Sequence, residues 1–438
     1  MCTDWLDEVV RAQKRGEALG IPSICSAHPF VLQAVLRHAA KADRPALIES
    51  TGNQVNPGGG YTGMRPRDFV GLVQRLADGC GFPLDRLILG GDHLGPGVWR
   101  SEPAEQALGK AEQMVRAYVE AGYTKIHLDA SVPLGDDAPE RSLPHEVVAE
   151  RTARLARAAE ESLRSAPLAS RQAGLRYVIG AEVPPAGGMA AEGRPLPVTT
   201  VESVAGTVAT THDAFLRYGL GSAWERVIAI VVQPGVEFGD EQVFDYAPER
   251  AEPLVRWIER QPRLVYEVHS TDFQTRTALA RLVRDHFAIL KVGPVLTWTL
   301  RRAAFALAMI ERELVPPDSC SRLIEVLDQA MEREPSHWRA YYTGTPEEQA
   351  RKRRYSLSDR IRYYWAQQDV QAAWQRLLSN LEQCAPLPLS LLGQYLPDAF
   401  RRVREGGLSP YPEEILYRAL EEVLETYTAA CYGCAVAP

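Results

Sequence analysis

Positive charge is scarce in this sequence, and lysine is scarcer still. The chain of 438 residues has a net charge of −7, and only 6 of its 49 basic residues are lysines. Because a nucleic-acid binder needs a basic face to contact phosphates, nucleic acid is excluded as the main partner. We attribute the excess of arginine to genome composition, although guanidinium groups also suit carboxylate and phosphate ligands.

Long hydrophobic runs and paired cysteines are also missing. No apolar stretch reaches the length of a membrane span, and the first residues lack the basic and apolar regions of a signal peptide. The seven cysteines are odd in number and scattered, which argues against a disulfide framework. The cytoplasm is therefore the expected compartment. We interpret Cys431 and Cys434, a terminal C-x-x-C pair, as part of a frayed tail rather than a metal or redox motif.

Eight short, mostly apolar segments alternate with helical patterns, which predicts a (β/α)8 TIM barrel of class α/β. The near-continuous apolar runs are typical of strands covered on both faces. A doubly wound open sheet is the alternative, but it seldom keeps eight such regular units. The predicted strands are 23–27, 45–50, the run from 87 that stops at 92–93, then 125–130, 177–182, 226–233, 264–269 and 288–293.

The pattern changes after Pro316 and Pro317, beyond which only helical periodicity remains. We therefore expect two domains, a barrel over 1–315 and an all-helical C-terminal annex over 316–438. Aromatic and basic residues mix densely over 351–365. This segment either packs on the barrel and buries its own aromatic residues, or closes over the mouth of the barrel, where Arg360 would meet an anionic substrate.

A polar side chain stands at the carboxyl end of each predicted strand. In a barrel these ends converge, so the polar side chains should lie close together. Two histidines with a carboxylate or amide oxygen form an open transition-metal site, so His93 and His269 are expected to meet over one divalent cation. The alternative is that polar residues merely finish strands at the water boundary. The strand-end residues are Ser26, Glu49, Asp92, His93, Asp129, Glu182, Gln233, His269 and Lys291.

Several long motifs stand out, and they lie at 52–56, 59–63, 89–96, 125–129, 232–236, 267–272 and 355–365. These motifs resemble the family of the class II D-tagatose-bisphosphate aldolase accessory subunit, and the likeness covers nearly the whole chain. The resemblance implies one of two functions: a non-catalytic partner of a separate aldolase subunit, or a metal-dependent epimerase at C4 of ketohexoses or their 6-phosphates. The kinase name also used for the family is disfavoured, because no G-x-x-x-x-G-K-[ST] loop occurs.

A more distant likeness to class II fructose-bisphosphate aldolases implies individual roles. By that comparison Asp92 is similar to the proton-transfer acid of those zinc enzymes, and Asp129 to a nearby acid. The implied metal ligands are His93, His269, Gln233 and Glu182. Zinc is the expected ion, with manganese, nickel or cobalt as alternatives.

Two departures from the aldolase pattern matter. Gln233 stands where the aldolases have a zinc histidine, and Met189 and Ala190 stand where they have an acidic pair. The second change argues against ordinary aldolase activity, because that acid shuttles protons at the nascent aldehyde. The hypothesis is therefore C4 epimerisation by reversible cleavage of the C3–C4 bond, with Asp92, Glu182 and Asp129 as catalytic candidates.

The remaining polar residues are candidates for substrate binding, the substrate being a sugar or sugar phosphate. Two rival chemistries are weaker: a Schiff base on Lys291, and nicotinamide binding by a G-x-G-x-x-G match at 58–63 that lies too far beyond its strand. An aldolase catalytic subunit or a second copy of this chain is a candidate partner. The substrate-binding candidates are Glu49, Asn53, Asn56, Lys291, Asp272, Ser270 and Arg360.

Overall fold

Eight parallel strands close into a barrel in the order β1-β10-β9-β6-β5-β4-β3-β2, which confirms the predicted TIM barrel. The computed structural model describes residues 4–138, 143–165, 174–180 and 196–433. A short antiparallel hairpin, β7 (Glu237–Phe238) with β8 (Val243–Phe244), follows β6. The barrel strands are β1 (Ile21–Cys25), β2 (Ala46–Thr51), β3 (Leu87–Leu94), β4 (Lys125–Leu128), β5 (Arg176–Ile179), β6 (Val227–Val231), β9 (Val265–Val268) and β10 (Phe287–Val292).

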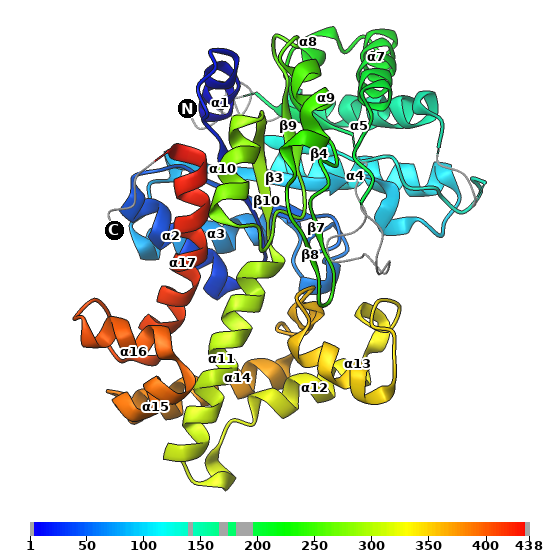
Figure 1. The fold of residues 1–438 in the computed structure, drawn as a ribbon. Helices are drawn as coiled ribbons and strands as arrows, with labels where there is room; N and C mark the ends of the chain where they lie inside the picture. Colours follow the sequence, from blue (N-terminus) through cyan, green and yellow to red (C-terminus); the bar gives the residue numbers. More distant parts are fainter. Residues whose placement is uncertain (1–3, 139–142, 166–173, 181–195, 434–438) are drawn as a thin grey trace.

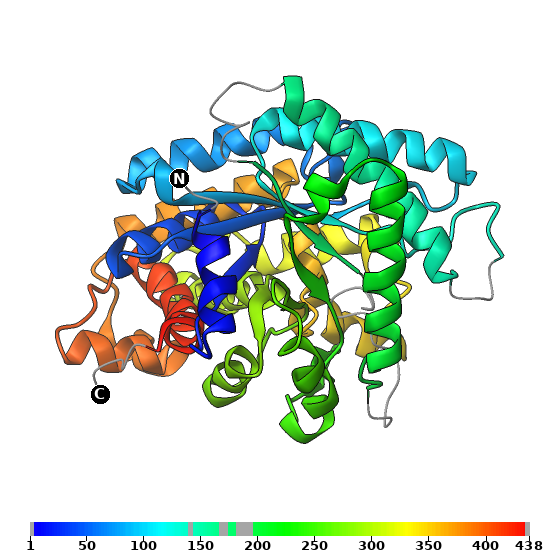
Figure 2. The same ribbon diagram turned by 90° about the horizontal axis from the view of Figure 1, so that it is seen from above.

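Helices surround the barrel, and Figure 2 shows them ringing it when the molecule is seen from above. The first helix ends at Lys14, and Gly16 adopts φ +80 just beyond this end. The helices of the barrel region are α1 (Asp4–Lys14), α2 (Pro29–Ala42), α3 (Pro66–Cys80), α4 (Ala104–Ala121), α5 (His145–Ser165), α7 (Val201–Arg217), α8 (Gly221–Trp224), α9 (Pro248–Ile258), α10 (Arg276–Arg284) and α11 (Pro294–Leu314).

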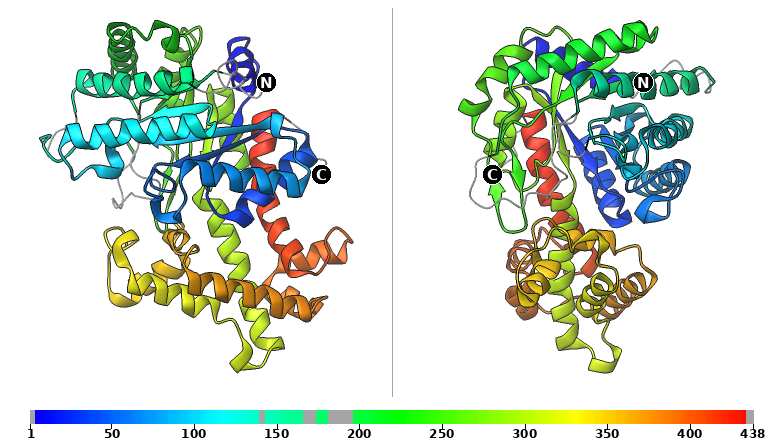
Figure 3. Two further views of the ribbon diagram at one scale, coloured as in Figure 1. Left: turned by 180° about the vertical axis from the view of Figure 1, so that it is seen from behind. Right: turned by 90° about the vertical axis from the view of Figure 1, so that its right-hand side faces the viewer.

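The C-terminal part is helical, as predicted, and lies at one end of the barrel in Figure 1 and in both views of Figure 3. From here on, the annex means α12 to α16 with their connections, without α17, which is described separately below. Within the described residues, no helix is long and apolar enough to span a membrane. The helices are α12 (Leu323–Arg333), α13 (Pro346–Tyr355), α14 (Gln368–Gln383), α15 (Leu389–Tyr395), α16 (Pro397–Arg404) and α17 (Pro412–Tyr432), with the 3-10 turn η6 (Arg360–Tyr363) between α13 and α14.

Helix α17 returns from the annex to the barrel wall, where it packs against α2, α10, α11 and β1. The ring of its Tyr417 stacks on Phe30 of α2 at 4.3 Å between centroids. Near its end, the Tyr427 hydroxyl donates to the carbonyl oxygen of Thr271, 2.9 Å away. The boundary at residue 315 stays a prediction. The interpretation of Cys431 as part of a frayed tail is wrong, because this residue is fully buried within α17.

The barrel interior changes from apolar to charged along its axis. At the amino ends of the strands, Leu6 and Val9 of α1 pack against inward-facing residues such as Leu47, Ile88 and Val265. Further along the same inward faces, at steps of two residues, the strands carry acids, lysines and histidines. Because side chains alternate between the two faces of a strand, a polar residue two positions after an inward apolar one also points inward.

Candidate metal centre and active site

Three imidazoles gather at the carboxyl end of the barrel. The ring centroids of His93 and His269 are 4.8 Å apart, and His127 lies 5.0 Å from the first and 5.4 Å from the second. With Asp92, these residues offer ligand atoms that all lie within 4.8 Å of one another. The structure therefore places His93 and His269 together at the mouth of the barrel, as expected, with His127 beside them.

The strand pattern explains how most of this cluster arises, and one residue departs from it. Asp92 follows Ile88 and Gly90 on the inward face of β3, so His93 would point outward in a regular strand. Instead the register between β3 and β4 shifts between Gly91 and Leu94, and His93 has φ +47. Such a bulge re-aims a side chain, and strained backbone of this kind occurs at functional sites.

Carboxylates orient two of the histidines. Asp129 accepts a hydrogen bond from Nδ1 of His93 at 2.8 Å, and Glu267 accepts one from Nε2 of His269 at 3.0 Å. In the neutral ring, each contact fixes the tautomer and leaves the other nitrogen available to a cation, which is the arrangement that metal-bound histidines show in proteins. Burial lowers the pKa of His269 to about 4, so this ring is neutral at physiological pH.

His127 is held more tightly by the protein itself. Its Nε2 donates to the carbonyl oxygen of Gly180 at 2.8 Å, and its Nδ1 lies 2.9 Å from Oδ1 of Asp92. His127 was not predicted from the sequence, because it lies inside β4, two positions before the strand-end residue Asp129. The same two-residue spacing along an inward face could have identified it.

A chain of alternating charges lies directly beneath the histidines and joins both sides of the site. Asp92 contacts Nζ of Lys291 at 2.9 Å, and Lys291 also contacts Glu49. Lys125 then bridges Glu49 and Glu267, with Nζ 2.6 Å from an oxygen of each. Since Glu267 bonds to His269, this network connects Asp92 to the second histidine through buried ion pairs.

Asp92 is ionised in this setting. Burial alone would raise its pKa, but the charges of His93 and Lys291 hold the pKa well below its usual range. Its Oδ2 lies 3.9 Å from Nε2 of His93 and 3.7 Å from Sγ of Cys25. The carboxylate can therefore accept a proton from a group bound beside His93.

The donor set fits a transition-metal ion. Imidazole nitrogens with a carboxylate oxygen suit zinc, nickel, cobalt or manganese better than calcium or magnesium. Buried Asp129 and Glu267 give the site a negative environment that favours a cation. Burial would lower the pKa of His93, but Asp92 and Asp129 raise it to about 9, which shows the strength of that environment.

Glycine is required where β3 leaves the barrel. A Cβ atom on Gly95 would lie 1.6 Å from the carbonyl oxygen of Asp129, so the two backbones touch only because this residue has no side chain. We expect Gly95→Ala to lower the free energy of unfolding by about 3 kcal/mol, because a backbone cannot move aside like a flexible side chain. Thermal and urea unfolding would measure the change.

Gly97→Ala is the matched control for that substitution. A Cβ at Gly97 meets nothing closer than a methyl of Val132 at 3.5 Å, which is an ordinary contact. The control should therefore unfold like the unchanged protein. Equal stability of the two variants would contradict the close approach of Gly95 to Asp129.

Several other candidates lie where the strands end but are engaged by neighbouring backbone. The Gln233 amide oxygen accepts from the backbone N–H groups of Gly235 and Val236, both at 2.8 Å, so its buried NH2 group is what remains for other contacts. The Asn56 oxygen accepts from Gly58 and Gly60 within its own loop. These two amides shape the loops around the site.

The remaining candidates divide between the mouth and other locations. Ser270 is buried with φ +54, and its hydroxyl has no hydrogen-bond partner within the described structure. Asp272 accepts from the backbone of Gly293 and Val295 at the start of α11. Asn53 is exposed. Glu182 lies outside the described residues, as do Met189, Ala190 and Cys434.

Arg360 is held within the annex. It donates to the carbonyl oxygen of His337 at 2.8 Å, and its guanidinium lies over the ring of Tyr341. The neighbouring Tyr363 of η6 instead reaches the barrel, with its ring 4.7 Å from that of Tyr61 in the loop after β2. The annex therefore covers part of the mouth, and the Arg360 guanidinium lies 6.0 Å from the centroid of the Tyr363 ring.

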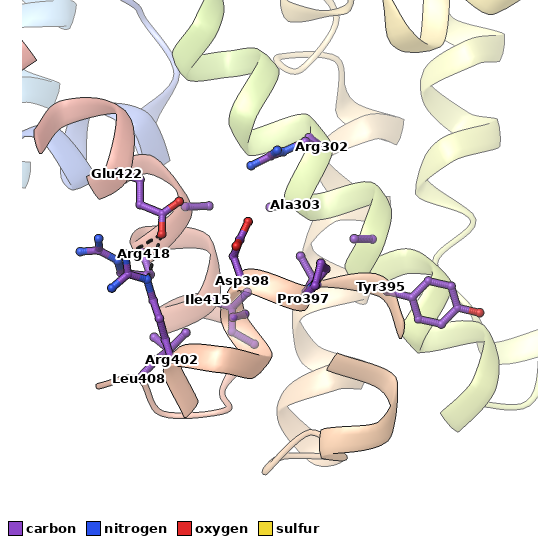
Figure 4. A pocket seen from close by; sticks show the side chains of 14 residues that line it. Arg302, Ala303, Tyr395, Pro397, Asp398, Arg402, Leu408, Ile415, Arg418 and Glu422 are labelled. Atoms are coloured by element: carbon purple, nitrogen blue, oxygen red, sulfur yellow. Dashed lines mark hydrogen bonds and ion pairs between the residues drawn. The ribbon is translucent and has the colours of Figure 1, made fainter. Parts of the chain in front are cut away.

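A separate cavity of about 150 Å³ lies between α11, α16 and α17 (Figure 4). Arg302, Tyr395 and Ile415 are among the residues that line it, and Glu422 at its edge accepts from Arg402 at 3.0 Å. It shares no residue with the histidine cluster. The chemistry predicted from the sequence does not extend to this cavity.

The comparisons with known proteins agree with the family suggested by the sequence motifs. A family model described as D-tagatose-1,6-bisphosphate aldolase subunit GatZ/KbaZ-like matches residues 6–432. A crystal structure of a probable tagatose 6 phosphate kinase from Sinorhizobium meliloti 1021 is 43% identical, with a TM-score of 0.85, over 94% of this chain and 100% of that chain. Fructose-bisphosphate aldolase (Fba) from Campylobacter jejuni is 15% identical, with a TM-score of 0.44, over 88% of this chain and 94% of that chain.

Proposed function

The chain belongs to the D-tagatose-1,6-bisphosphate aldolase subunit GatZ/KbaZ-like family, and on that premise we propose that it is a metal-dependent C4 epimerase of a ketohexose or ketohexose 6-phosphate. The substrates would be the fructose and tagatose forms. One observation carries the proposal: an ionised carboxylate, Asp92, lies among three imidazoles whose ligand atoms are within 4.8 Å of it. A base beside a cation site suits cleavage and re-formation of a carbon–carbon bond.

The chemistry of the sugar limits the ways in which C4 can be inverted. In a 2-ketose the carbonyl acidifies the hydrogens on C1 and C3, whereas the hydrogen on C4 is not acidic. Inversion at C4 therefore needs either oxidation by a nicotinamide or reversible breaking of the C3–C4 bond. The nicotinamide motif is weak in this sequence, so we favour bond cleavage.

The histidines of the cluster would hold the metal ion. His93 and His269 would hold a divalent cation through the ring nitrogens that Asp129 and Glu267 leave free, with His127 beside them. When bound, the cation supplies Lewis-acid stabilisation of the negative charge that develops on the substrate during cleavage.

Asp92 acts as the general base in this proposal. It accepts the proton of the C4 hydroxyl, the C3–C4 bond breaks, and the aldehyde fragment presents its other face before the bond re-forms. Asp92 then returns the proton to the new C4 oxygen. Lys291 keeps the carboxylate ionised and in place through its 2.9 Å contact.

Metal removal tests this proposal. We expect the zinc- or manganese-loaded protein to convert fructose 6-phosphate, fructose or both into the tagatose form, and a chelator to abolish the conversion until metal is returned. Carbon-13 NMR would follow both sugars. Release of free three-carbon products as the main outcome would contradict an epimerase that retains its fragments.

Borohydride trapping tests the rival mechanism, in which the amine of Lys291 forms a Schiff base with the sugar. Lys291 already contacts two carboxylates, Asp92 and Glu49, so it is protonated and a poor nucleophile. We therefore expect no borohydride-dependent adduct on the chain. A trapped adduct at Lys291 together with activity that survives the chelator would replace the metal proposal.

A second function also has support, because the family is that of an aldolase subunit. In that case the chain stabilises a separate catalytic subunit and turns over no sugar itself. Substitution of His93 or His269 would then leave support of the partner unchanged. Assays of the chain alone, and of the chain with an aldolase catalytic subunit, distinguish the two functions.

A further inference from the structure

The turn η6 brings one arginine of the annex to the mouth of the barrel. Asp359, the residue before η6, is buried and accepts from Nε of Arg301 at 2.7 Å and from the Thr297 hydroxyl at 2.6 Å. Both partners lie on α11, which begins directly after β10. This clamp fixes η6 above the ends of β10 and β1, and Asp359 itself has φ +47.

Arg362 is the charged residue that this clamp places against the barrel loops. Its guanidinium donates to the Asp359 carbonyl oxygen at 3.1 Å, to the Ser358 carbonyl oxygen and to the Tyr363 hydroxyl at 3.0 Å. All three acceptors are uncharged. Within the described part of the chain, Arg362 has no ion pair, although its side chain is only partly exposed.

Two barrel loops face Arg362. Arg362 donates to the Tyr363 hydroxyl, and the ring of Tyr363 lies 4.7 Å from that of Tyr61. Burial brings the pKa of Asp272 to about 6, and the charge of Arg362 opposes that rise. Tyr61 follows β2 and Asp272 follows β9. Because β1 and β10 lie between those strands, Arg362 lies over the β10–β1 side of the mouth.

This side of a TIM barrel commonly holds the phosphate of a substrate, at the loops after strands seven and eight and a helix N-terminus. Here Asp272 already occupies the backbone donors at the start of α11, bonding to Gly293 and Val295. A phosphate group at this place would therefore need a side-chain cation. The Arg362 guanidinium, whose hydrogen bonds within the described structure all go to uncharged oxygens, supplies one, with donors spaced for two phosphate oxygens.

We infer that Arg362 binds the phosphate group of the substrate, so that the site takes a phosphorylated ketohexose in preference to the free sugar. The inference rests on the proposed function for the identity of the sugar, but not for the phosphate contact. Arg362 is a specificity-determining residue in this scheme, and Asp92 with the histidines performs the chemistry. The annex thereby contributes a binding group to the barrel.

The experiment compares Arg362→Gln with the metal-loaded unchanged protein and with Arg351→Gln. Arg351 is an exposed arginine of the annex, 3.2 Å from Glu241, and serves as the matched control. Calorimetry would measure the binding of fructose 6-phosphate, inorganic phosphate and fructose, and NMR would measure turnover. We expect Arg362→Gln to weaken fructose 6-phosphate about 10- to 100-fold, the value of a hydrogen bond to a charged group, and to leave fructose binding unchanged.

Other outcomes of this experiment would overturn the inference or separate it from the epimerase proposal. Equal weakening of fructose and fructose 6-phosphate, or of neither, would overturn the inference. If the unchanged protein turns over no sugar yet loses phosphate-ester affinity on Arg362→Gln, the phosphate contact stands and the epimerase proposal fails. Arg362→Lys is the second variant: it keeps the charge without the paired donors and should show an intermediate loss confined to the phosphorylated ligand.

Discussion

Replacing Lys125 with methionine is expected to lower the free energy of unfolding by about 3–5 kcal/mol, because it breaks a buried ion pair and leaves charge uncompensated. The side chain is fully buried, and Nζ lies 2.6 Å from oxygens of both Glu49 and Glu267. Methionine fills a similar volume, so packing changes little. The network from Asp92 to Glu267 then carries two net negative charges instead of one. The loss is a large part of the roughly 5–15 kcal/mol that stabilises a typical domain.

Two further variants separate charge from general damage in that experiment. Lys110→Met removes an exposed pair with Glu102 and should cost at most about 1 kcal/mol. Lys125→Met combined with Glu267→Gln restores the net charge of the network, so the double variant should be more stable than Lys125→Met alone. Urea unfolding in the presence of a chelator measures all three. A loss below about 1 kcal/mol for Lys125→Met would contradict the proposed role of the network.

The barrel was predictable because each strand is a short apolar run between turn signals, and runs of that kind recur eight times. The site was predictable where chemistry falls at a strand end, as with Asp92 and His269. His127, Lys125 and Glu267 lie inside strands whose outward neighbours are apolar. They became visible only once the inward face of each strand was known.

Contacts between distant segments account for the rest. The return of α17 to the barrel wall depends on packing such as that of Tyr417 on Phe30, which no local pattern encodes. Likewise, Arg360 and Arg362 are two residues apart in one basic segment. The left-handed backbone of Asp359 and its clamp to α11 fix η6, in which Arg360 bonds to His337 and Arg362 bonds to Tyr363.

His93→Gly is expected to cost about a thousandfold in epimerisation and to make the metal-free protein less stable at neutral pH. The activity estimate follows because Lewis-acid stabilisation is worth several kcal/mol, and about 1.4 kcal/mol corresponds to a factor of ten. The stability loss follows because Asp92 and Asp129 raise the pKa of His93 to about 9, so the charged ring stabilises the fold at neutral pH. Relief of the left-handed backbone at φ +47, worth about 1–2 kcal/mol, offsets only part of that loss. Sugar conversion with metal and thermal unfolding with chelator would measure the two effects.

Two matched variants test why His93 has these two effects. His93→Asn suits a left-handed backbone better than most residues do but also removes the imidazole, so it should lose the same activity and a similar amount of stability. His212→Asn alters a partly exposed histidine of α7, remote from the cluster, and should change neither property. If His93→Gly kept metal binding and turnover, the cation would have to be held elsewhere. Loss of activity with unchanged stability would instead retain the metal site, while showing that relief of the left-handed backbone fully offsets the lost charge.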